Sequence, residues 1–122
     1  MSSGSQAVAP GDLEEEWGVR LTRLTLIADG GLVDLRYEVT DPRKASRVLD
    51  PEQPAYLLEE TSGKAVTTAQ FPKLGNLRPQ SKELEGGRSY FMEFSNPGVL
   101  FEPGDHVTLA LGPHRLEHAV VH

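Results

Sequence analysis

The chain of 122 residues has no cysteine, few aromatic residues and no long apolar run. Without cysteine it has no thiol nucleophile, no disulfide and no cysteine-ligated zinc or iron–sulfur cluster. Its apolar residues come in short blocks, and none approaches the about 20 consecutive apolar residues that a membrane-spanning helix needs. The N-terminus also lacks the basic and apolar regions of a signal peptide. These absences predict a soluble chain without a membrane span.

Negative charge is concentrated near the N-terminus. The formal net charge is -6, and the first four acidic residues precede every lysine and arginine: Asp12, Glu14, Glu15 and Glu16. The whole chain has 18 acidic and 12 basic residues, so the part that follows is nearly balanced. Because nucleic-acid binding needs a concentrated basic face, this balance predicts no nucleic-acid partner.

The length fits one domain. Residues 1–11 are mostly Ser, Gly, Ala and Pro without a hydrophobic period, so we expect residues 1–16 to form a flexible leader. Residues 17–122 then form a single β-domain. A domain of this size buries about two-thirds of the surface of its unfolded chain, so it needs neither a metal nor a disulfide for stability. We expect no cofactor.

Short alternating segments fill the chain from Trp17 onward. In the clearest one, Val33, Leu35, Tyr37 and Val39 alternate with polar residues, which is typical of a strand with one buried face. Other strands, bounded by Gly and Pro turns, are predicted over 17–26, 55–60, 65–69, 81–84, 89–95, 106–111 and 116–121.

Two local signals modify this pattern. The apolar alternation changes phase near Thr22 and Arg23, which predicts a bulge in the first strand. Asp41-Pro42 suits the start of one short helical turn that continues to about Leu49. Together the segments predict an all-β fold, an antiparallel immunoglobulin-like β-sandwich of seven or eight short strands with one short helical turn.

The long connection between the fourth and fifth predicted strands is the first candidate site. The connection carries cations and apolar residues but no acidic residue. We expect an acidic segment of a protein partner to bind to Phe71, Lys73, Leu77, Arg78 and Lys82. The alternative is a crossover that only plugs the end of the sandwich, with its cations in water.

Histidines near the C-terminus are the second candidate. His106, His118 and His122, with Met92 as a soft ligand, could hold copper or zinc. On a strand, His118 and His122 lie about 13 Å apart, too far to share one zinc ion. A helix would instead stack His114, His118 and His122, but Pro113 and the β-branched Val120 and Val121 favour a strand.

No motif of an enzyme is present. The sequence has no nucleophile elbow around a serine, no glycine-rich phosphate loop and no carboxylate pair on one strand face. Glu59 and Glu60 are adjacent and therefore point to opposite faces of a strand. We expect Trp17 to anchor the core and the protein not to be an enzyme.

Several stretches resemble a family of small bacterial proteins that follow an export or lipoprotein signal. The stretches that carry the likeness are Trp17-Gly18-Val19, Asp34-Leu35-Arg36-Tyr37, Asp41-Pro42, Lys44-Ala45, Pro72-Lys73, Leu77-Arg78, Gly87-Arg88, Tyr90-Phe91-Met92, Asn96-Pro97-Gly98 and Pro103-Gly104. The resemblance implies one compact β-domain and a periplasmic or envelope location, with a signal or lipid anchor lost from this chain. It implies no catalytic residue. The cytoplasm stays the alternative location, because this chain has neither a signal nor a lipobox cysteine.

The leading hypothesis is therefore a non-enzymatic interaction or accessory domain of the bacterial cell envelope. The alternative is a copper or zinc binding protein that uses its C-terminal histidines.

Overall fold

The computed structural model describes residues 7–49, 53–68, 70–71, 75–76 and 84–122. Its strands are β1 (Ala7–Val8), β2 (Val19–Ile27), β3 (Leu32–Val39), β4 (Ala55–Glu59), β5 (Ala65–Thr67), β6 (Gln70–Phe71), β7 (Gly75–Asn76), β8 (Ser89–Ser95), β9 (His106–Leu111) and β10 (His114–Val120). Its helices are α1 (Leu13–Trp17) and α2 (Pro42–Val48), with 3-10 turns η1 (Pro10–Asp12) and η3 (Pro97–Val99).

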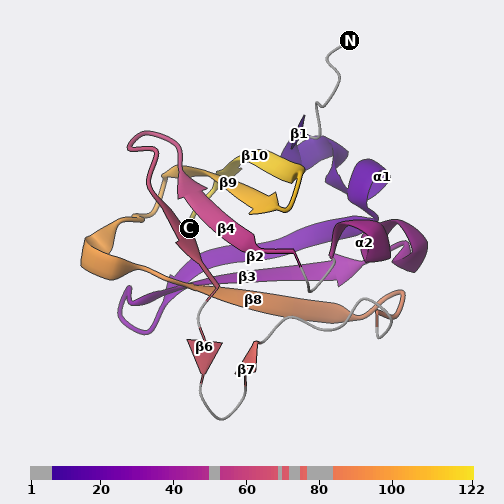
Figure 1. The fold of residues 1–122 in the computed structure, drawn as a ribbon, viewed down its shortest axis with the longest axis horizontal. Coiled ribbons are helices and arrows are strands. Elements are labelled where there is room, and N and C mark those ends of the chain that lie inside the picture. Colours follow the sequence, from indigo (N-terminus) through magenta and orange to yellow (C-terminus); the bar gives the residue numbers. More distant parts are fainter. Residues whose placement is uncertain (1–6, 50–52, 69, 72–74, 77–83) are drawn as a thin grey trace.

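The strands form two sheets that lie one above the other (Figure 1). One sheet has the order β1-β10-β9-β4-β5, and the other has the order β2-β3-β8. The pair β6 and β7 lies apart from both sheets. A mostly β, two-sheet fold is thus confirmed, and every strand pair is antiparallel except β1 with β10.

Several local predictions are confirmed. The register of β2 against β3 shifts between Leu21 and Arg23, where a bulge was expected. The Asp41 carboxylate accepts hydrogen bonds from the backbone N–H groups of Arg43 and Lys44, so it caps α2 as its sequence predicts. The C-terminal segment is a strand, β10, although it begins at His114, two residues before the predicted start.

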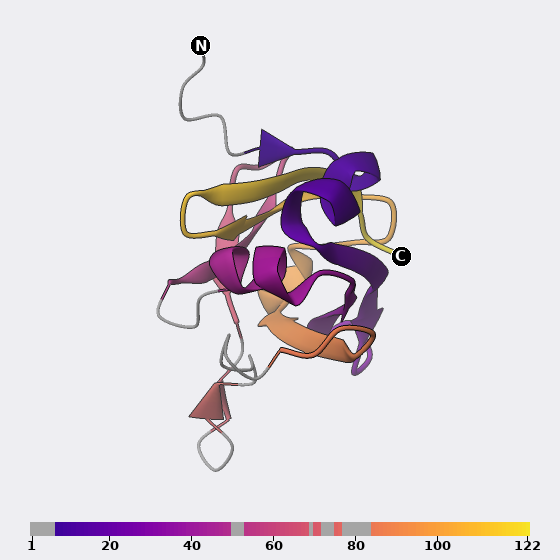
Figure 2. The ribbon, with the colours of Figure 1, turned by 90° about the vertical axis from the view of Figure 1, so that its right-hand side faces the viewer.

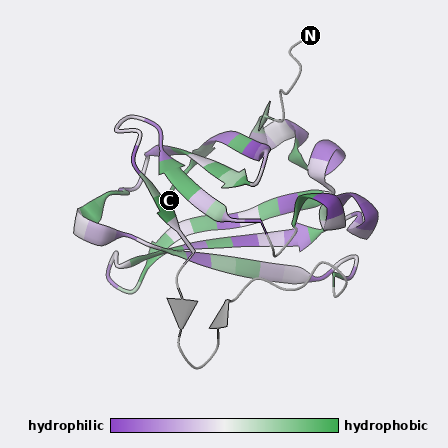
Figure 3. Ribbon diagram, in the orientation of Figure 1, coloured by the Kyte–Doolittle hydropathy of each residue, from purple (hydrophilic) through white to green (hydrophobic). Residues whose placement is uncertain are grey.

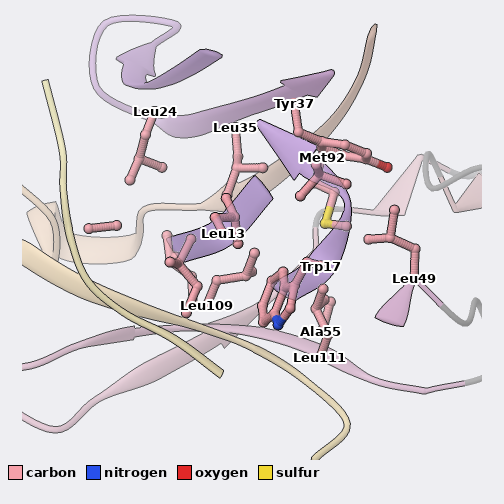
Figure 4. Close-up of a cluster of buried hydrophobic side chains, with 14 of the residues drawn as sticks. Leu13, Trp17, Leu24, Leu35, Tyr37, Leu49, Ala55, Met92, Leu109 and Leu111 are labelled. Carbon is pink, nitrogen blue, oxygen red and sulfur yellow. The ribbon is translucent and has the colours of Figure 1, made fainter. Parts of the chain in front are cut away.

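The core fills the space between the two sheets. Side chains that alternate along each strand point inward, and Figure 3 shows the resulting change between apolar and polar residues along the ribbons. Trp17, Leu35, Met92 and Leu109 come together from different elements in this cluster (Figure 4). Trp17 is buried, so the predicted role as a core anchor is confirmed.

Backbone hydrogen bonds join the two sheets at their corners without closing them into a barrel. At one corner His122, which follows β10, donates to the Leu24 carbonyl at 2.9 Å and accepts from the Leu26 N–H at 3.1 Å. At the other corner Thr68 and Phe94 form an isolated bridge. The carboxamide of Asn96 also links the turn after β2 to the segment before β9, through the Gly30 and Phe101 backbones.

The structure differs from the predicted boundary at Trp17. Residues 7–16 contain β1, η1 and most of α1, and β1 pairs with β10. Leu13 is 3% exposed and belongs to the core cluster. The reason is spacing: Leu13 and Trp17 are four residues apart, so one turn of helix places both on the same face. Trp17 therefore ends a helix, whereas a strand was predicted to start there.

Among the residues that the structure describes, no helix is long and apolar enough to cross a membrane.

Candidate functional site

A cleft of about 650 Å³ is bounded by the N-terminal segment, α2 and the turn from β9 to β10. Figure 2 shows α1 beside α2, with β1 lying on the same side of the molecule. Most of the cleft's lining is polar. Its volume lies within the range that small-molecule and peptide sites occupy in proteins.

One wall of the cleft is acidic and comes from η1 and α1. Asp12, Glu15 and Glu16 line it, and all three are exposed. Glu15 and Glu16 lie in α1, which the positive φ of 70° at Gly18 terminates, and Asp12 immediately precedes this helix. Carboxylates are favourable in the first turn of a helix, because the unpaired N–H groups there carry partial positive charge.

Another part of the lining is basic and comes from α2. Lys44 and Arg47 are three residues apart, so they lie on the same side of the helix. The Lys44 ammonium donates a 2.7 Å hydrogen bond to the Glu15 carbonyl, which ties α2 to α1. Within the described chain, no ion pair joins Lys44 or Arg47 to a carboxylate.

Gly18 fixes how closely the two helices approach. Its carbonyl accepts hydrogen bonds from the N–H groups of Thr40 at 2.7 Å and Asp41 at 2.9 Å. A Cβ atom on Gly18 would lie 2.6 Å from the Asp41 carbonyl and 2.9 Å from the Lys44 Cβ. Only glycine therefore allows the end of α1 to approach the start of α2 this closely.

Trp17 and His114 form the inner end of the cleft. Their rings meet edge to face, with centroids 6.3 Å apart and planes at 77°. Trp17 also lies in the core, so its indole separates the core from the cleft. The half-buried His114 ring gives an apolar side chain of a ligand a surface to contact, and the buried Trp17 supports it from below.

The third wall is the backbone of Ala7, Val8 and Ala9. Among the described residues, strand β1 is an edge of its sheet and pairs only with β10. Within that part of the chain, the other side of β1 can form backbone hydrogen bonds with an added strand.

The predicted partner-binding loop lies mostly outside the described residues. The structure does not describe Lys73, Leu77, Arg78 and Lys82. For Phe71 it describes only the backbone, which pairs with Gly75 where β6 meets β7. The role of this loop stays a prediction.

The structure does not bring the four predicted metal ligands together. Met92 is buried in the core, whereas His106, His118 and His122 are exposed. Across the described ranges, no three His, Asp or Glu side chains are close enough to hold a metal ion. A bulge between Leu116 and Ala119 also breaks the alternation that was expected to point His118 and His122 the same way.

His118 instead pairs with Glu60. Its backbone N–H donates to the Glu60 carboxylate at 2.8 Å, its ring Nδ1 lies 3.0 Å from that carboxylate, and the Thr108 hydroxyl donates to it at 2.8 Å. Burial by itself would raise the pKa of Glu60, but these hydrogen bonds and the charge of His118 together lower the pKa below its ordinary value. This carboxylate supports the bulge, in which His118 has a positive φ of 66°.

Sequence reasoning missed the cleft because it assigned the acidic run to a leader. The signal that could have found it is the segment Leu13 to Trp17, in which two apolar residues four apart flank three glutamates. Such spacing indicates one amphipathic turn of helix with its acids facing water.

Searches against protein families, characterised proteins and solved structures find no match to this chain.

Proposed function

We propose that the chain is a non-enzymatic binding domain that receives an extended, charged segment of a protein partner in the cleft between α1 and α2. The observation that carries the proposal is that charges of opposite sign line one cleft beside the edge strand β1. Among the described residues, neither Lys44 nor Arg47 forms an ion pair. For the scaffold we propose an immunoglobulin-like sandwich, based on its two facing sheets, in which every strand pair but β1 with β10 is antiparallel.

The charges of the cleft select the partner by complementarity. A carboxylate of the bound segment would lie toward Lys44 and Arg47, and a lysine or arginine would lie toward Asp12, Glu15 and Glu16. Charge pairs at an exposed rim contribute modestly to affinity, but they speed association and exclude segments of the wrong charge pattern. The proposal therefore concerns a partner segment that carries both signs.

The edge strand β1 supports an extended conformation for that segment. A strand added to a sheet edge gains main-chain hydrogen bonds, while its alternate side chains enter neighbouring pockets. Here the neighbouring surface is the half-buried ring of His114, which packs edge to face on the buried Trp17. One side chain of the segment would contact the His114 ring while its backbone lies along Ala7 to Ala9.

We place this role in the bacterial cell envelope as part of the same proposal. The support is the resemblance of the chain to exported β-domains. Fractionation of cells that express the native gene tests it: the protein should be in the envelope fractions, and its recovery with cytoplasmic markers would contradict the location.

A library of short linear peptides tests the binding function. Peptides selected on the wild-type domain should carry both charges, and Arg47→Glu should weaken their binding about tenfold or more, because it replaces attraction by repulsion. Addition of such a peptide should shift the NMR signals of the Trp17 indole and of Ala7 to Ala9.

Arg43→Glu is the matched control. It makes the same change of charge on the same helix, but Arg43 does not line the cleft, so affinity should stay within about twofold. Equal binding to the Arg47→Glu variant, or shifts confined to other surfaces, would remove the cleft as the binding site.

A further inference from the structure

Two arginines lie directly opposite each other on the outer face of the three-stranded sheet. Arg23 on β2 pairs in register with Arg36 on β3, and Arg36 pairs with Phe91 on β8. The three side chains therefore form one row across the sheet. Like charges directly opposite each other on neighbouring strands are destabilising, so this row needs a physical reason.

A buried carboxylate lies beside the two arginines. Asp34 is 1% exposed although it is on the outer face, and its Oδ2 lies 2.9 Å from Arg36 Nε and 3.5 Å from Arg23 Nε. Among the described residues, its Oδ1 atom has no hydrogen-bond partner. Burial of a charge is costly unless it is paired, so Asp34 holds both guanidinium groups close to it.

The contacts leave the outer ends of both guanidinium groups available. Each arginine uses Nε toward Asp34, and no terminal nitrogen of either is bonded within the described part of the chain. The side chains of Arg23 and Arg36 are 50% and 49% exposed. The ring of Phe91 lies under the Arg36 guanidinium, 5.4 Å from its carbon to the ring centroid, and restricts its motion.

We propose that Arg23 and Arg36 form a binding site for the dianionic phosphate of a small phosphate monoester. The two guanidinium groups present four terminal nitrogens, each with two N–H donors, in a planar geometry that matches phosphate oxygens. Because Asp34 and Phe91 already restrain these groups, little side-chain entropy is lost when the anion binds. The single charge of Asp34 leaves one of the two arginine charges uncompensated, which a bound phosphate would neutralise.

Neighbouring charges set the strength of this site. Glu93 lies opposite Asp34 on β8 and has no ion pair among the described residues, so its carboxylate opposes an incoming anion. Arg20, on the same face, already pairs with Glu14 and Glu38 and is not available. The site therefore consists of Arg23 and Arg36, and Glu93 weakens it.

Titration with phenyl phosphate, inorganic phosphate, benzoate and chloride at constant ionic strength tests the site. Phenyl phosphate should bind with a Kd below about 1 mM and shift the Arg23 and Arg36 side-chain NMR signals. Benzoate and chloride should bind at least about tenfold more weakly, because they present fewer charged oxygens. Tighter binding of inorganic phosphate than of phenyl phosphate would overturn the monoester in favour of the free ion.

Substitutions distinguish specific binding at Arg23 and Arg36 from general electrostatic attraction of anions. Arg23→Gln and Arg36→Gln should each weaken phenyl phosphate binding about tenfold, and Glu93→Gln should strengthen it about twofold to fivefold. Arg20→Gln is the control and should leave the Kd within about twofold.

Asp34→Asn gives the sharpest outcome. This substitution removes a negative charge, so general electrostatic attraction of anions would strengthen phosphate binding. If Asp34 instead orients the guanidinium groups of Arg23 and Arg36, its loss should weaken binding severalfold. Melting curves identify variants that fail to fold. If Asp34→Asn does not fold, Arg23→Gln is the deciding variant, because the contact of Arg23 with Asp34 is the longer of the two. Binding that strengthens in folded Asp34→Asn, or that stays unchanged in Arg23→Gln, would overturn the proposal.

Discussion

At the scale of single residues, Gly18 has the tightest surroundings of the glycines in the described chain. Its φ of 70° is unfavourable for other residues, and a Cβ atom would lie 2.6 Å from a backbone oxygen, which has little freedom to move. Gly18→Ala should therefore lower the free energy of unfolding by about 2–4 kcal/mol, measured by urea denaturation.

Gly63→Ala is the matched control for this prediction. Gly63 has a similar φ of 76°, but a Cβ atom there would meet nothing within 4 Å. It should cost only about 1 kcal/mol, which is the conformational term alone. Equal losses in the two variants would contradict the close contact between α1 and α2.

Glu60 makes stability depend on pH. Its pKa is lowered in the folded state, so its carboxylate stabilises the fold at pH values above its ordinary pKa of 4.5, and this contribution is lost as the pH falls through the folded pKa. Glu60→Gln should cost about 1–2 kcal/mol at pH 7, and the difference from wild type should shrink below about pH 4. Denaturation curves across this pH range measure it.

Glu117→Gln is the control for Glu60. Glu117 forms only an exposed pair with Arg115 at 3.6 Å, so its loss should change stability by less than about 0.5 kcal/mol at either pH. If the Glu60 variant lost the same amount at pH 3 as at pH 7, the charge of its carboxylate would not be the stabilising factor.

At the scale of elements, α2 depends on its N-terminal cap. Asp41 accepts from the N–H of Arg43 at 3.1 Å and of Lys44 at 3.4 Å. Asp41→Ala should lower the free energy of unfolding by about 1 kcal/mol, whereas Asp41→Asn keeps an acceptor oxygen and should lose less than half of that. Chemical denaturation of the two variants side by side checks the difference, and equal losses would show that the cap does not stabilise α2.

At the scale of the whole molecule, the N-terminal segment is part of the core. Leu13 packs in the buried cluster between the sheets, so Leu13→Ala should lower the free energy of unfolding by about 2–4 kcal/mol. The same substitution in a flexible leader would change the free energy of unfolding by less than about 0.5 kcal/mol. Urea denaturation of the wild type and of Leu13→Ala distinguishes the two outcomes.

Local patterns in the sequence determined most of the elements. The alternation from Val33 to Val39, the change of phase near Arg23 and the Asp41-Pro42 start of α2 each depend on neighbours a few residues away, and each is confirmed. Such features follow from side-chain period and backbone geometry, which a short segment already contains.

Only the tertiary structure decided which surfaces come together. The charge of Glu15 and that of Arg47 face one cleft because Gly18 lets α1 approach α2, and Glu60 meets His118 because β4, β9 and β10 are neighbours in one sheet. These contacts join residues far apart in the chain, and the order of strands that brings them together depends on the packing of the whole core. No local period of the sequence encodes that order.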